Sequence, residues 1–176
     1  MAERSPADVA KAWKVAEAEI ARERKKHEKR GLAFAGLSRE EYEKKLKRVE
    51  SPIILWHGWT VSTQPGGSIL CMAGVQNPDT FFWHSLALAI SFGNRNPIAR
   101  HDEFLTGFDS RFPTCAKPAP HGFSLAPFAT TSYMFQIGIP VGIEKTGYFG
   151  NWVLQQMNWL DVGKYLDRGA FFFDVI

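Results

Sequence analysis

Residues 82–92 read Phe-Trp-His-Ser-Leu-Ala-Leu-Ala-Ile-Ser-Phe, and this alternation of side chains decides the fold class. Successive side chains of a strand point to opposite faces of a sheet, so every second residue shares one face. The buried face is expected to hold Phe82, His84, Leu86, Leu88, Ile90 and Phe92. The stretch predicts a long β-strand, with His84 as a core histidine rather than a metal ligand.

The same period of two recurs before and after this strand. Residues 69–75 alternate after the turn-forming Gln-Pro-Gly-Gly at 64–67, and residues 133–139 alternate up to Pro140. Further strands are expected at 53–62, 148–160 and 170–176. No amphipathic stretch of helix length separates these segments, which favours an antiparallel sandwich over a parallel sheet. Residues 94–132 contain five prolines and predict short edge strands with a long loop.

Composition changes at Ser51-Pro52. Residues 1–50 contain 14 of the 21 Lys and Arg residues and 10 of the 18 Asp and Glu residues, but few of the aromatic residues. We therefore predict two domains, a charged helical arm over residues 1–51 and a mainly β sandwich over residues 52–176.

Two helices are expected in the arm. Ser5 is a suitable N-cap before Pro6, and Ser38 with Glu41 has the spacing of a capping box. The apolar stripes of both helices are thin, so the helices need a partner surface to be stable. The segment 32–35 between them is expected to be an apolar connector.

Residues that contact a partner protein are expected on these stripes and on the long strand at 148–160. Aromatic side chains lie on both faces of that strand. One face fills the core, and the other must meet the arm, another subunit or a ligand, because large apolar patches are seldom exposed. The predicted partner-contact residues are Val9, Trp13, Ile20, Tyr42, Leu46 and Trp152.

The order of turns and strands over residues 52–176 resembles the immunoglobulin-like sandwich modules of bacterial surface proteins called cell-adhesion-related domains. The resemblance is carried by Pro-Gly-Gly-Ser-Ile at 65–69, Ala-Gly-Val-Gln-Asn-Pro at 73–78 and Ser-Phe-Gly at 91–93. In that family a leucine-proline-glycine-like turn opens the fifth strand, whereas residues 125–128 read Leu-Ala-Pro-Phe, without the glycine. The resemblance implies a structural or adhesive role and supplies no catalytic residues. The helices of the arm lie outside it.

No set of residues in the sequence makes a catalytic or metal site. The five histidines and two cysteines lack the close spacing of metal ligands. A nucleophilic set could form only if distant loop residues converged, which their spacing does not require. Its members would be His101, Asp102, Cys115 and His121.

An ADP-ribosyltransferase-like enzyme, or a degenerate relative of one, is the enzymatic alternative. Trp-His-Gly-Trp at 56–59 would suit such an enzyme, which also needs a glutamate near its C-terminal strands to stabilise a cationic transition state. The corresponding residues 155–158 are Gln-Gln-Met-Asn, without a carboxylate. We therefore predict no enzymatic activity, no catalytic residues, no cofactor and no bound metal.

The sequence favours a structural or docking subunit of a larger assembly, of a virion-surface or appendage type, with the sandwich for interaction and the arm for anchoring. The partners are expected to be proteins, including further copies of the chain. The basic run at 22–30 allows nucleic acid, but glutamates interrupt it. A carbohydrate-binding sandwich is a further alternative. Neither a membrane span nor a signal peptide is expected, which predicts assembly in the cytoplasm.

Overall fold

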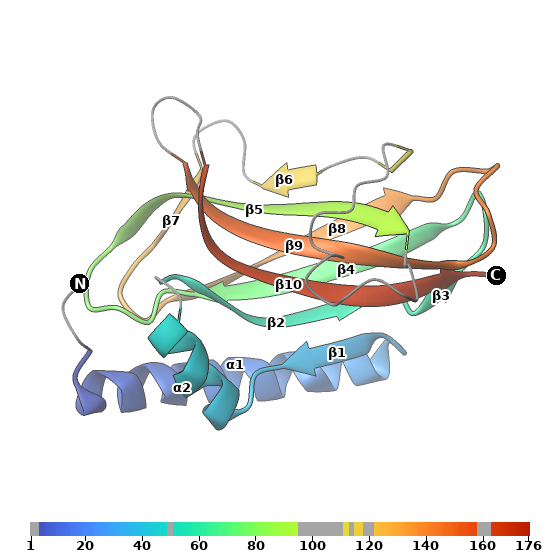
Figure 1. Ribbon diagram of the computed structural model, residues 1–176. Coiled ribbons are helices and arrows are strands. Elements are labelled where there is room, and N and C mark those ends of the chain that lie inside the picture. Colours follow the sequence, from blue (N-terminus) through green and yellow to red (C-terminus); the bar gives the residue numbers. More distant parts are fainter. Residues whose placement is uncertain (1–3, 49–50, 95–110, 113–114, 118–121, 158–162) are drawn as a thin grey trace.

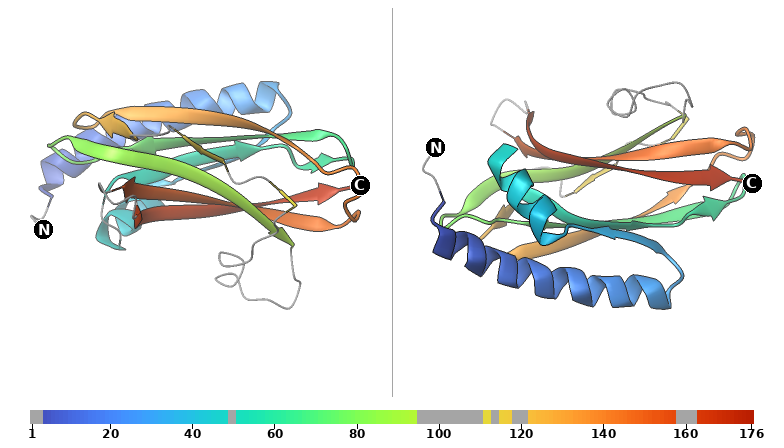
Figure 2. Two further views of the ribbon diagram at one scale, coloured as in Figure 1. Left: turned by 90° about the horizontal axis from the view of Figure 1, so that it is seen from above. Right: turned by 60° about the horizontal axis from the view of Figure 1, so that its bottom comes forward.

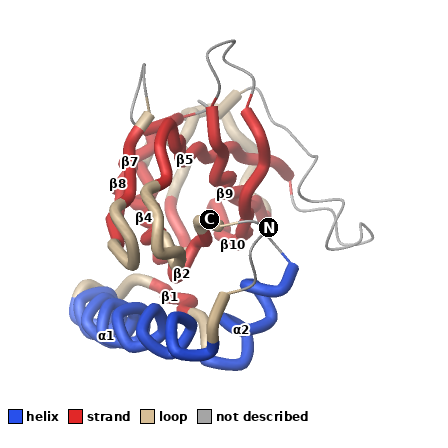
Figure 3. Tube along the Cα trace, turned by 90° about the vertical axis from the view of Figure 1, so that its left-hand side faces the viewer, coloured by secondary structure: helices blue, strands red, loops and turns tan. Residues whose placement is uncertain are grey.

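The computed structural model describes residues 4–48, 51–94, 111–112, 115–117, 122–157 and 163–176. Two β-sheets pack face to face, and two helices cover the outer side of one of them (Figure 1, Figure 3). The predicted fold class, a mainly β antiparallel sandwich with an N-terminal helical extension, is confirmed. Neither helix in the described part of the chain is long and apolar enough to cross a membrane.

The sheet that carries the helices, called here the helix-bearing sheet, has four antiparallel strands. Their order is β1 (Ala33–Gly36), β2 (Ile53–Trp59), β4 (Ser68–Gln76) and β8 (Thr130–Gly138). The opposite sheet has the order β3 (Ser62–Thr63), β10 (Gly163–Val175), β9 (Gly147–Met157), β5 (Trp83–Asn94) and β6 (Cys115–Lys117), and β7 (Phe123–Leu125) also pairs with β5. All described pairs are antiparallel except β3 with β10.

The main core lies between the two sheets. Alternating residues of β4, β5, β8, β9 and β10 fill it, because every second side chain of each strand points inward. Trp152, Tyr148 and Phe171 are among its largest side chains and are almost completely buried. The aromatic content of the chain is therefore used mainly to fill the space between the sheets.

A second core lies between the helix-bearing sheet and the helices. β2 has an irregular register between Ile54 and Trp56, so Leu55 and Trp56 both face the helices. Tyr42 of α2 and Trp56 are 0% and 1% exposed, and α1 contributes Ala12, Ala16 and Ile20 to the same cluster. The arm thus rests on the outer face of β2 and β4.

Both helices begin at the predicted caps. α1 (Pro6–Lys29) starts after Ser5, whose hydroxyl accepts a hydrogen bond from the backbone N–H of Asp8 at 3.1 Å. α2 (Arg39–Arg48) follows a complete capping box: the Glu41 N–H donates to the Ser38 hydroxyl, and the Ser38 N–H donates to the Glu41 carboxylate. The hydrogen bond from the Ser38 backbone N–H to the carboxylate, with a smaller contribution from the Ser38 hydroxyl, holds the pKa of Glu41 below its usual value.

The predicted connector at 32–35 is wrong in one respect, because it contributes most of strand β1. β1 pairs with β2 over four residues, and the Phe34 ring stacks on Trp56 with centroids 5.7 Å apart. The guanidinium of Arg24 lies over the Phe34 ring, 5.3 Å from its centroid. The arm therefore adds a strand to the sandwich. The predicted division into two domains at residue 51 stays a prediction, and the strand that the arm contributes is the reason to expect the opposite result when the arm is deleted.

Buried polar side chains join the arm to the end of β4. Gln76 accepts a hydrogen bond from the Tyr42 hydroxyl at 2.7 Å and donates one to the Ala12 carbonyl at 2.9 Å. Asp79 accepts from the Arg4 guanidinium at 2.7 Å and from the Trp83 indole at 2.8 Å. Gln76 has no exposed surface, so its bonds to Tyr42 of α2 and to the Ala12 carbonyl of α1 fix the position of both helices on the sheet.

His84 is exposed, which contradicts its predicted place in the core. Ser85 has a φ of 59°, and the pairing of β5 with β7 shifts register between Trp83 and Leu86. This irregularity reverses the alternation, so Leu86 begins the buried set while Phe82 and His84 face solvent. The last strand also starts earlier than predicted, at Gly163 instead of residue 170.

Candidate protein-interaction surface

The structure places the predicted partner-contact residues inside the chain. Ile20, Tyr42 and Leu46 belong to the second core, and Val9 and Trp13 are half-buried against it. Trp152 lies between the two sheets with no exposed surface. The apolar stripes of the arm therefore have a partner surface within the chain, and their contact with another molecule stays a prediction that requires the arm to leave the sheet.

The solvent-facing side of α1 is a basic ridge. Residues of a helix are about 100° apart around its axis, so Lys11, Ala18 and Arg22 lie opposite the buried Ala16, Ile20 and His27. Glu17 and Glu28 lie on one flank of this face. The ridge extends over about 27 Å. We define the basic ridge by its six cations, which are Lys11, Lys14, Arg22, Lys25, Lys26 and Lys29.

Buried carboxylates offset two of these six charges. Glu19 pairs with Arg22, and Glu23 lies 3.3 Å from the ammonium of Lys26, while both carboxylates are less than a tenth exposed. Lys11 instead lies over the Phe128 ring, 4.8 Å from its centroid. Within the described residues, Lys14, Lys25 and Lys29 have no carboxylate within 4 Å, so the ridge keeps a positive field.

A shallow groove separates this ridge from strand β8. Thr130 lines it from the beginning of β8, and the helix contributes three cations, one carboxylate that pairs with Arg22 and two small apolar residues, which are Lys11, Lys14, Arg22, Glu19, Val15 and Ala18. A second hollow continues along α1 over Arg22, Lys25 and Lys29. The cations of the ridge thus stand beside an edge strand rather than over a flat surface.

His57 belongs to the Trp-His-Gly-Trp segment at 56–59, which suggested the ADP-ribosyltransferase-like alternative, and the structure describes its surroundings. Its ring stacks on Trp59 with centroids 5.2 Å apart and lies near Phe171. Burial, with a smaller contribution from the charge of Lys45, lowers the pKa of His57 to about 4. The imidazole packs against the rings of Trp59 and Phe171, and the described ion pairs and hydrogen bonds bring no carboxylate to it. The side chains of His101, Asp102, Cys115 and His121 lie outside the described residues.

The shifted pKa of His57 predicts lower stability in acid. The unfolded chain binds a proton at His57 below about pH 6.5, whereas the folded chain does so only near pH 4. The free energy of unfolding should therefore fall as the pH is lowered through this window, by about 2 kcal/mol between pH 7 and 4.5. Denaturant titrations of the wild type and of His57→Gln measure this term as their difference, since carboxylates contribute equally to both. An identical pH dependence in the two proteins would contradict it.

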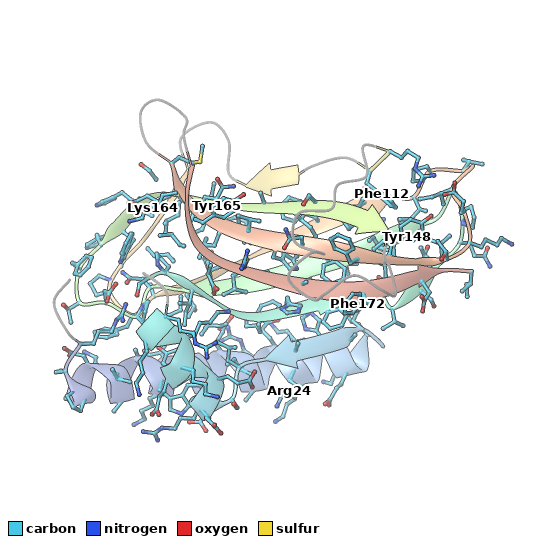
Figure 4. The ribbon with its side chains drawn as sticks, in the orientation of Figure 1. Arg24, Phe112, Tyr148, Lys164, Tyr165 and Phe172 are labelled. Atoms are coloured by element: carbon cyan, nitrogen blue, oxygen red, sulfur yellow. The ribbon has the colours of Figure 1, made fainter. Side chains whose placement is uncertain are left out.

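Two separate groups of exposed aromatic side chains lie on or beside the opposite sheet, and one of them is Phe81 and Phe82 packed beside Trp83 and His84 at the beginning of β5. Tyr165 and Phe172 of β10 are 70% and 37% exposed and lie toward different ends of the strand (Figure 4). Seven residues of a strand span about 23 Å, which is too far for two rings to stack on one sugar. The basic ridge with its groove is therefore a more continuous candidate surface than the two aromatic side chains of β10.

Comparisons with known proteins support the fold. No family model and no curated protein sequence matches the chain. Among solved structures, the C-terminal domain of Wzt is similar with a TM-score of 0.54 and 11% identity, over 82% of this chain and 78% of that one. A β-glucuronidase of Bacteroides uniformis has a TM-score of 0.51 and 10% identity over 72% of this chain, which is 15% of the enzyme.

The chain is an immunoglobulin-like β-sandwich. The CARDB domain of a Pyrococcus furiosus protein is also similar, with a TM-score of 0.43 and 11% identity over 72% of this chain and 93% of that domain. The predicted resemblance is confirmed at the level of the β-sandwich fold by the two-sheet architecture and by the likeness to the Wzt domain. Sandwiches of this kind occur in binding proteins and as parts of enzymes, so the function of this one must be argued from its own surface.

Proposed function

We propose that this sandwich is a non-catalytic docking subunit of a larger protein assembly, of a virion-surface or appendage type. The observation that carries the proposal is that the two sides of α1 have different surroundings. Its apolar side is buried against the chain's own sheet, and its solvent side presents the basic ridge. The partner that fits this surface is an acidic segment of another protein.

The strength of such a contact follows from the number of unpaired cations. A single exposed ion pair contributes at most about 1 kcal/mol, but several along one helix act on the same ligand. The hollows beside the ridge, lined by Ala18 and Ala21, also let an approaching chain come close to the helix. Multiple weak pairs therefore supply affinity and orientation together.

Neutralising the ridge should weaken binding to an acidic polymer. The triple variant Lys14→Gln, Lys25→Gln, Lys29→Gln is expected to bind poly-glutamate at least tenfold more weakly than the wild type, with a shallower dependence on salt. The matched control removes three exposed lysines elsewhere, Lys44, Lys47 and Lys145, and should change the affinity less than twofold.

Fluorescence anisotropy at 50 and 300 mM salt measures both effects. Equal losses in the two triple variants would mean that net charge, and not the ridge, attracts the polymer. Single-stranded DNA is titrated in parallel. Tighter binding to DNA than to poly-glutamate, lost in the same ridge variant, would overturn docking to an acidic protein in favour of nucleic acid.

The predicted anchoring through Val9, Trp13 and Ile20 is a second way for the arm to join copies of the chain. It requires the arm of one copy to occupy the second core of another, in place of its own contacts with Leu55 and Trp56. Sedimentation of the wild type against Trp13→Ala tests it. A wild-type oligomer that Trp13→Ala dissociates would favour arm exchange over docking through the ridge.

A further inference from the structure

Strand β8 has an edge that no other described strand covers. It is the last strand of the helix-bearing sheet and pairs only with β4 among the described strands. Figure 2 shows it along the margin of the sandwich, beside α1. Its nine residues, Thr-Thr-Ser-Tyr-Met-Phe-Gln-Ile-Gly, include no proline and no charged side chain. Proteins normally protect edge strands with such residues, and an edge of this length without them presents backbone groups with which another strand can pair.

The pairing with β4 determines which backbone groups the edge presents. The hydrogen bonds from Ile139 N–H to the Gly67 carbonyl (2.8 Å) and from Asn77 N–H to the Ala129 carbonyl (3.0 Å) fix the bonded pairs at odd-numbered residues of β8. In an antiparallel ladder the alternate residues direct their N–H and C=O groups to the other side. These outward groups belong to Thr130, Ser132, Met134, Gln136 and Gly138.

The same alternate residues face the side of the sheet that carries α1. Met134 lies opposite Met72 of β4, and Met72 packs against the second core under the helices. Met134 itself is 55% exposed, so the outer face of β8 is not covered like that of β2. Residues of an added antiparallel strand that bond to this edge would carry their side chains on this face as well. They would therefore stand beside the groove that Thr130 shares with Lys11, Lys14 and Arg22.

We propose that β8 accepts an extended acidic segment of a partner protein as a fifth, antiparallel strand of the helix-bearing sheet. Main-chain hydrogen bonds to β8 provide the affinity, and acidic side chains at every second position meet the cations of the basic ridge. This inference rests on the proposed docking function and specifies the shape of the segment that docks.

A second copy of the chain is a poorer occupant of the same edge. Pairing of two β8 strands would bring two basic ridges beside one interface, and like charges across an interface oppose association. An acidic strand has the opposite sign and turns the same charges into attraction. The backbone groups of β8 could pair with any extended segment. The positive charge on α1 favours an acidic segment over a basic one.

The test uses a fluorescein-labelled nonapeptide in which glutamate and valine alternate, with two N-methylated isomers of it. Antiparallel addition directs the glutamate amides toward β8, so methylating those amides should weaken binding at least tenfold. Methylating the valine amides, which point to solvent, should change it less than twofold. A loss confined to the valine isomer would overturn the antiparallel pairing.

A variant of the protein gives the complementary measurement. Ser132→Pro removes an edge N–H while leaving the ladder with β4 intact, since that N–H points away from β4. We expect at least a tenfold loss of peptide affinity with unchanged affinity for poly-glutamate. The control is Thr131→Ser, whose side chain lies on the opposite face of β8. This variant should bind the peptide as the wild type does.

The outcomes separate the inference from the proposed function. If the peptide binds equally well with either set of methyl groups, yet more weakly to the ridge variant, docking is electrostatic and strand addition is wrong. If poly-glutamate binds but the peptide does not, strand addition is also wrong and the docking function stands. If the wild type forms dimers that Ser132→Pro dissociates, a second copy occupies the edge and the acidic segment is wrong.

Discussion

A chain that begins at Pro52 is expected to lose its cooperative unfolding transition at moderate temperature and to associate. The deletion removes both helices and β1, and it uncovers Leu55 and Trp56, which are 1% exposed in the complete chain. Each such side chain contributes about 2–3 kcal/mol when buried, and a domain of this size is stable by only about 5–15 kcal/mol. Deletion also opens the β2 edge that β1 covers, which invites pairing between copies.

Calorimetry and sedimentation of the two chains measure this effect. Adding residues 1–51 as a separate peptide should restore the transition, because the contacts and not the chain connection stabilise the sheet. A Pro52 chain that melts cooperatively within about 2 °C of the full chain would show that residues 52–176 form an independent domain and that the arm is an appendage.

Gly58→Ala is expected to lower the free energy of unfolding by about 3 kcal/mol. A methyl group on Gly58 would overlap the imidazole of His27, which is 1% exposed. The ring cannot easily move, since its Nδ1 donates a hydrogen bond to the Glu23 carbonyl at 2.7 Å and its faces meet Phe34 and Trp56. The substitution should therefore push the C-terminal half of α1 away from β2.

A double variant identifies this overlap as the cause. Gly58→Ala combined with His27→Ala should recover at least half of the lost stability, because the smaller side chain makes room for the methyl group. Gly138→Ala is the matched control, since nothing lies within 4 Å of its added carbon. Denaturant unfolding measures all four proteins. A loss for Gly58→Ala as small as that for Gly138→Ala would contradict the packing described.

The sandwich was predictable because most of its strands have one buried face. At Ile69, Cys71, Ala73 and Val75 of β4, the period of two in the sequence is also the period of burial. The helix caps were predictable for a similar reason, since Ser5 and Ser38 act within their own helices. Local chemistry sufficed in both cases.

Features that depend on distant contacts were not predictable. Asp167 interrupts the alternation of β10, yet it is 6% exposed because it accepts a hydrogen bond from Ile54 N–H and pairs with Lys45 at 2.8 Å. Both partners come from more than a hundred residues earlier. The reversal at Ser85 likewise follows from pairing between β5 and β7 and has no signature in the period of the sequence.

The candidate surface was predictable only in part. The basic run at 22–30 is plain in the sequence. Which of its cations point outward depends on their angle around the helix axis relative to the buried stripe, and the sequence alone does not give that angle. Arg22 and Lys26 face solvent beside glutamates, whereas His27 of the same run lies under Phe34 and Trp56. The open edge of β8 could not be foreseen, because the sequence does not state which strand comes last in a sheet.

The course of β10 has a mechanical consequence. α1 begins near one end of the sandwich, and β10 ends at the other, with its last residues held between β9 and β3 (Figure 1). Tension applied between these two ends runs along β10 rather than across it. The hydrogen bonds to β9 are then loaded together in shear and cannot open one after another, so we expect the molecule to resist stretching along its long axis far better than peeling from its side.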